Sequence, residues 1–144
     1  MKYILTIFAL TAIMFSACSD KLAEEVKKLD TEVIAVHDEV MPKMTEIAKL
    51  QKKMKGRIDN LVSQGEMTDS LTKELSISKE ALTKLETAEK SMNDWMMKYH
   101  EVSSQKVDSK TMLEALKAEK DKVTVVKDQI LSSLKEARKI FPNE

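Results

Sequence analysis

The chain has 144 residues, of which 33% are charged and 42% hydrophobic, and 24 basic side chains balance 24 acidic ones. With only 2 Gly and 2 Pro, it cannot supply the frequent turns of a β-sandwich or barrel, so we expect a single all-α domain. The lack of a basic excess argues against nucleic-acid binding. The single Cys excludes an internal disulfide and a CxxC zinc site.

The first 17 residues have the layout of a secretory signal peptide. Lys2 is their one charged residue, and it precedes an apolar run over residues 3–14 and the small pair Ser16-Ala17. This order is typical of a cleaved signal. A permanent membrane span is disfavoured, because the apolar stretch ends after about 16 residues and a bilayer needs roughly 20.

The segment Phe15-Ser16-Ala17-Cys18 resembles the lipobox of bacterial lipoproteins. Phe15 departs from the Leu, Val or Ile that is usual at the first position, and the other positions fit. We therefore predict cleavage between Ala17 and Cys18 and acylation of Cys18, with a buried structural Cys as the alternative. Several acyl chains hold a protein firmly at a membrane, since each buried CH₂ contributes about 0.8 kcal/mol.

The residues after Cys18 bear on the choice of membrane. In enteric lipoproteins an Asp directly after the lipidated Cys retains the protein at the inner membrane. Here Ser19 occupies that position and Asp20 comes one place later. The resemblance therefore implies an outer-membrane protein facing the periplasm, with display at the cell surface as the open alternative.

The part from Cys18 onward is predicted to be helical almost throughout. Its apolar residues recur at spacings of three and four, which is a heptad seam. Gly65 is suited to end the first helix, Thr68 or Asp69 can cap the second, and Asp108 or Ser109 can cap the third. The three predicted seams are Leu22, Val26, Leu29, Val33, Val36, Val40, Met44, Ile47, Leu50, Met54, Ile58 and Leu61; Leu71, Leu75, Leu82, Leu85, Met92, Trp95/Met96 and Tyr99; and Leu113, Leu116, Val123, Val126, Ile130, Leu134, Ala137 and Phe141.

Short connections favour antiparallel neighbours, so the expected fold is a long antiparallel, coiled-coil-like three-helix bundle. The first helix spans about 43 residues and the others about 32 each, so about 15 Å of the first helix should extend past the bundle. The expected division is a signal peptide (1–17), a lipid anchor with a helical stalk (18–31) and a bundle domain (32–144). A parallel coiled-coil oligomer of long helical hairpins is the alternative.

Pro42 lies in the middle of the first predicted helix. Proline removes one helical hydrogen bond and clashes with the preceding turn. We predict a kink near Pro42 that wraps this helix around its partners, and a hinge or partner-contact site is the functional alternative.

Methionine and histidine side chains form two groups at helical spacing. One group lies in the first helix and the other in the second, and antiparallel pairing could bring them together. Thioether and imidazole ligands suit Cu(I) or Ag(I), whereas methionine also serves as a flexible core filler. The candidate ligands are His37, Met41 and Met44, together with Met92, Met96 and His100.

Large apolar side chains concentrate late in the second helix. Trp95 and Met97 cannot both face the seam used by Met92, Met96 and Tyr99, so at least one apolar group should be exposed. Aromatic residues and methionine are enriched at protein interfaces and are equally common in bundle cores. Trp95 and Met97 are the candidate partner contacts.

Patterns that support catalysis are missing from the sequence. It contains no Gly-rich phosphate loop and no HExxH, and the single thiol is expected to carry lipid. The interspersed charges are typical of a solvated helix surface. We therefore expect a protein that is not an enzyme and uses no cofactor.

Three segments resemble a group of small helical lipoproteins of Bacteroidota that are often labelled viral A-type inclusion protein. They are residues 37–44 (HDEVMPKM), 94–97 (DWMM) and 122–129 (KVTVVKDQ). The likeness implies the compartment and the fold but no activity. The chain also shares a lipobox and heptads with the Braun-type murein lipoprotein, but it lacks the terminal Lys of that family, so no covalent peptidoglycan link is expected.

These observations predict a non-enzymatic, lipid-anchored envelope protein that acts as a structural or adaptor module. Its helix faces would contact a protein partner or a second copy of the chain. The alternatives are a periplasmic bundle that binds Cu or Ag and a chaperone-like bundle.

Overall fold

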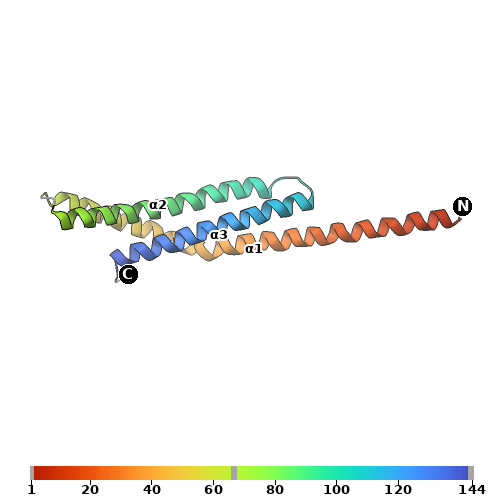
Figure 1. Cartoon of the computed structure of the whole chain (residues 1–144), viewed down its shortest axis with the longest axis horizontal. Helices are drawn as coiled ribbons and strands as arrows, with labels where there is room; N and C mark the ends of the chain where they lie inside the picture. Colours follow the sequence, from red (N-terminus) through yellow and green to blue (C-terminus); the bar gives the residue numbers. More distant parts are fainter. Residues whose placement is uncertain (1, 66–67, 143–144) are drawn as a thin grey trace.

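The computed structural model describes the backbone of residues 2–65 and 68–142 and the side chains of residues 21–65 and 68–142. It contains three helices, α1 (Lys2–Ser63), α2 (Asp69–Ser103) and α3 (Ser109–Ile140), and each contacts both others. Figure 1 shows a long bundle, with α1 extending beyond α2 and α3 at its amino-terminal end. The prediction of an all-α three-helix bundle is confirmed.

Local sequence signals set the ends of the helices. Gly65 follows α1 with a φ of 79°, a left-handed conformation that favours glycine. The Thr68 side chain accepts a hydrogen bond from the Leu71 amide at 3.2 Å, and Asp108 accepts bonds from the amides of Lys110 and Thr111 at 3.0 and 3.1 Å. Of the candidate residues at each start, Thr68 and Asp108 are therefore the N-caps.

The core is aliphatic and follows the predicted seams. Val33, Val40 and Ile47 of α1 are fully buried, as are Val123 and Ile130 of α3. Around them pack further seam residues and the small side chains of α2, which let the helices approach closely. The remaining members of the core cluster are Leu50, Met54, Ala81, Leu85, Ala88, Met92, Trp95, Val126, Leu134 and Ala137.

Ion pairs set the register between α1 and α3. Three glutamates spaced by heptads on α1 accept hydrogen bonds from three basic residues on α3. Partner numbers differ by 88 in the first two pairs and by 92 in the third, so the two helices run parallel. The pairs are Glu32–Lys120, Glu39–Lys127 and Glu46–Arg138.

The α2 helix runs antiparallel to α1. Gln51 donates a hydrogen bond to Glu89, and the next contact along α1, from Lys55, goes back along α2 to Glu86. The chain therefore runs up, down and up, as short connections require. The Lys84–Glu136 pair joins α2 to α3 at 2.6 Å, which raises the pKa of Lys84 to about 12 and lowers that of Glu136.

Two expectations for α1 concern its middle and its beginning. The helix is continuous through Pro42, and a bend there stays a prediction. Contacts with the other helices reach Asp30, which accepts a hydrogen bond from Tyr99. The division between an 18–31 stalk and a 32–144 bundle also stays a prediction, and Asp30 lies on the stalk side of it.

The cap of α3 gives a stability prediction. Replacing Asp108 with Ala leaves the Lys110 and Thr111 amides without their acceptor and should lower the free energy of unfolding by about 1 kcal/mol. Urea denaturation measures the change. Asp128→Ala, at an exposed site in the middle of the same helix, is the matched control and should cause no loss. Equal losses for the two variants would contradict the capping role.

Candidate functional site

Polar and aromatic side chains interrupt the aliphatic core toward the end of the bundle that carries the α2–α3 connection. The group, termed here the polar core cluster, consists of Asp30 and His37 of α1, Trp95 and Tyr99 of α2, and Glu119 of α3. The Trp95 ring centroid lies 4.9 Å from that of Tyr99 in a stacked arrangement and 5.6 Å from that of His37. The Tyr99 hydroxyl donates a hydrogen bond to Asp30. Because Glu119 belongs to α3, each of the three helices contributes to the cluster.

Electrostatics keep the Tyr99 phenol neutral. Burial raises its pKa well above the ordinary value of 10, and the hydrogen bond to Asp30 raises it further. The negative charges of Asp30 and Glu119 act in the same direction, which shows that Glu119 lies within electrostatic reach of the phenol. Tyr99 is therefore a hydrogen-bond donor throughout the neutral range.

The buried side-chain polar atoms that lack a partner all belong to this cluster, within the part of the chain whose side chains are described. They are His37 Nε2, Trp95 Nε1 and Glu119 Oε2. Glu119 is only 2% exposed, and its other oxygen accepts a hydrogen bond from Lys122. An unpartnered buried polar group costs about 1–3 kcal/mol. The three unpartnered atoms of this cluster therefore lower the free energy of unfolding of the bundle.

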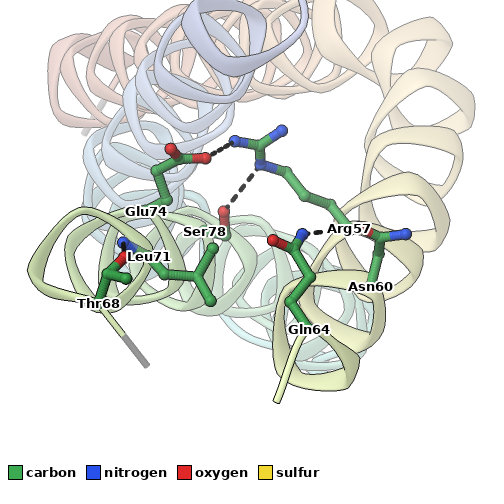
Figure 2. A network of polar contacts seen from close by, with 7 residues as sticks. All are labelled: Arg57, Asn60, Gln64, Thr68, Leu71, Glu74 and Ser78. Carbon is green, nitrogen blue, oxygen red and sulfur yellow. Dashed lines mark hydrogen bonds and ion pairs between the residues drawn. The ribbon is translucent and has the colours of Figure 1, made fainter. Parts of the chain in front are cut away.

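A second polar group lies at the opposite end of the bundle, near the α1–α2 connection. Figure 2 shows the Arg57 side chain reaching from α1 to Ser78 and Glu74 of α2. Arg57 Nε donates to Ser78 Oγ at 3.2 Å, and Nη2 donates to Glu74 at 2.7 Å. Ser78 is 1% exposed, and its hydroxyl has a partner, so this network closes the end of the bundle at little cost.

Glu119 and Ser78 are core residues that the sequence analysis missed. Glu119 stands between Leu116 and Val123, at spacings of three and four, and Ser78 stands between Leu75 and Leu82 in the same way. Each therefore occupies a seam position. In both cases the sequence signal for a polar core residue was a polar side chain at a heptad position that is normally apolar.

The candidate metal ligands lie in different environments. Met92 is buried, Met41 and Met44 pack against the core, and Met96 and His100 are exposed. His37 is half-buried, and its Nδ1 bonds Asp38 at 2.9 Å. Among the described residues, no three or more His, Cys, Asp or Glu side chains form a group that could hold a metal ion. Nothing in this arrangement favours the metal hypothesis over core packing for the methionines.

The two candidate partner contacts differ in exposure. Trp95 is 4% exposed and is held between His37 and Tyr99, whereas Met97 is 63% exposed. The expectation of at least one exposed apolar group on this stretch is confirmed. Only Met97 has the exposure that a contact with another protein requires.

The lipidation site lies outside the residues whose side chains are described. This applies to both Ala17 and Cys18. In the described residues, no helix combines the length and the apolar character needed to cross a membrane.

Comparison with known protein families, with curated proteins and with solved structures gives no match to this chain.

Glu119 gives a prediction about the cost of the polar core cluster. Replacing Glu119 with Leu removes an unpartnered buried oxygen and should raise the free energy of unfolding by about 1–3 kcal/mol. Urea denaturation measures it. Glu114→Leu, at an exposed position five residues earlier on α3, is the control and should change stability by less than about 0.5 kcal/mol. A Glu119→Leu variant less stable than the parent protein would contradict this account.

Tyr99 gives a prediction about pH. Because folding raises its pKa, the phenol stabilises the fold fully below the unfolded-state pKa of 10, and this stabilisation is lost as pH rises above that value. Tyr99→Phe should cost about 1 kcal/mol at neutral pH through the lost hydrogen bond, and the difference between the two proteins should shrink above pH 10. Urea midpoints on both sides of that pH measure it. A constant difference would count against the raised pKa of the Tyr99 phenol.

Proposed function

We propose that this chain is a lipid-anchored, non-enzymatic protein of the bacterial cell envelope. The observation that carries the proposal is the segment Phe15-Ser16-Ala17-Cys18, which follows an apolar run and contains the only Cys of the chain. A thiol at this position has a specific chemical use as the acceptor of diacylglycerol. Ser19 in place of Asp after the Cys favours the outer membrane, as does the likeness to small lipoproteins of Bacteroidota.

The bundle acts in this proposal as a structural or adaptor module. Two features support a role in contacts rather than in catalysis. Apart from Lys122–Glu119, the described ion pairs join exposed or partly exposed side chains, with pairs such as Glu39–Lys127 and Lys84–Glu136 linking neighbouring helices. Met97 offers an exposed apolar side chain for a protein partner or a second copy. A bend at Pro42 would change the direction of α1 along such a surface.

Alternatives have less support. A Cu(I) or Ag(I) site would need Met92, which is buried in the core, to act together with the exposed Met96 and His100. A chaperone-like bundle would need a broad apolar face for unfolded clients. The most exposed apolar side chains of the described residues are instead distributed over the three helices, at Val62, Ile77, Met97 and Val125.

Cys18 provides the test of the lipid anchor. In cells that process lipoproteins, the parent protein should float with the outer-membrane fraction and incorporate labelled fatty acid. Cys18→Ala should lose the label and leave the membrane fraction, because the acceptor thiol is gone.

The matched control is Ser19→Ala, which keeps the thiol and should behave like the parent protein. Ser19→Asp places an acidic residue directly after the lipidated Cys and should shift the protein toward the inner membrane. A Cys18→Ala protein that still fractionates with the membrane would reject the anchor.

A further inference from the structure

The α2–α3 connection lies close to the start of the predicted mature chain. The offset of 88 residues between α1 and α3 places Ser109, the first residue of α3, level with residue 21 of α1. On α2, Tyr99 is level with Asp30, and α2 ends shortly after it, at Ser103. At a rise of 1.5 Å per residue, the connection is within about 12 Å of Cys18 along the axis of α1. Figure 1 shows this loop at the end of the bundle from which α1 extends.

The connection exposes cationic and apolar side chains. Lys106 of the connection and Lys110, the second residue of α3, are exposed, and neither side chain has an ion-pair partner among the described residues. Val107 between them is 42% exposed. The one carboxylate of the connection, Asp108, is occupied by the amides at the start of α3 and by the Thr111 hydroxyl. The exposed acids closest in sequence are Glu101, on the last turn of α2, and Glu114, one helical turn after Lys110 on α3.

We propose that the α2–α3 loop is a second membrane contact, in which Val107 enters the headgroup layer and Lys106 and Lys110 bind the phosphates of anionic phospholipids. This inference rests on the proposed lipid anchor at Cys18, because the anchor brings the loop to the bilayer. Basic side chains next to a membrane are attracted by its negative surface potential, and this attraction falls off within a Debye length. The start of α3 meets that condition, because Ser109 is level with residue 21 of α1, about 5 Å from Cys18 along the helix axis, and the Debye length is about 8–10 Å.

The contact would fix the orientation of the bundle relative to the membrane. Its helices would rise directly from the membrane surface, without a long stalk between lipid and bundle. The α1–α2 connection, closed by Arg57, Glu74 and Ser78, would be the end directed away from the bilayer. Met97, nearly two turns before the end of α2, would lie near the membrane.

Lysine acetylation tests the contact directly. The mature chain, residues 18–144, is coupled through Cys18 to a maleimide lipid in vesicles of equal parts phosphatidylcholine and phosphatidylglycerol. It keeps every helix–helix hydrogen bond and ion pair of the described residues, since these begin at Asp30, and circular dichroism checks its fold. Acetylation of each lysine by an N-hydroxysuccinimide ester is followed by mass spectrometry for coupled and free chains.

Lys106 and Lys110 should react several-fold more slowly in the coupled chain than in the free chain. Lys73 and Lys79, exposed near the opposite end of α2, should react equally in both. Vesicles of phosphatidylcholine alone should give weaker protection. Unchanged rates at Lys106 and Lys110 would overturn the inference, and so would an equal slowing at Lys73 and Lys79, because the bundle would then lie flat.

Val107→Asp supplies the matched variant. It should restore the acetylation of Lys106 and Lys110, whereas Val62→Asp, at an exposed position near the other end of the bundle, should leave them protected. Protection that survives Val107→Asp unchanged would reject the insertion of Val107. The chemical tether replaces natural lipidation, so a failure of the lipid anchor is seen in cell fractionation and a failure of the loop contact is seen in the lysine rates.

Discussion

The parallel register of α1 and α3 is the constraint on which the other features of this structure depend. Heptad-spaced glutamates on α1 meet basic side chains on α3 at a nearly constant offset, and the buried seams of both helices then face each other. Exposed ion pairs contribute little to stability individually, but a shift by one turn would break all of them and misplace the seams. Once this pairing is set, α2 can only pack antiparallel between the two connections.

The same register decides where the polar residues of the core meet. At the α1–α2 connection, the buried Ser78 has the Arg57 side chain beside it and is satisfied. Toward the other end, His37, Trp95 and Glu119 come together, and each keeps a buried atom without a partner. The two ends therefore differ in hydrogen bonding. The buried Ser78 hydroxyl has a partner at one end, whereas three buried polar atoms lack a partner at the other. Local opening of the bundle should cost less free energy at the polar core cluster than at the Arg57 network.

The fold could be predicted from the sequence because its signals are local. Gly65, Thr68 and Asp108 act through the backbone of their own turns, and the heptad spacing alone identifies most of the core. The polar core cluster could not be predicted in this way. Trp95 fits the seam of α2 and is exposed or buried depending on what α1 and α3 place against it. Glu119 becomes a core residue only when the register brings it near Tyr99. The ion pairs between α1 and α3 join residues about 90 positions apart, and sequence spacing within one helix does not choose among such partners.

Membrane attachment and the polar core cluster concern the same end of the molecule. If Cys18 holds α1 at the bilayer and the α2–α3 loop contacts the headgroups, then all three helices are fixed near one plane at the end where the core is least complete. Each contact restrains a helix end near the unpartnered His37, Trp95 and Glu119 atoms. The lipid surface would then limit the opening of the cluster, as a ligand that binds only the closed bundle would. The opposite end, held by Arg57, Glu74 and Ser78, needs no such support, since its polar groups are satisfied within the chain.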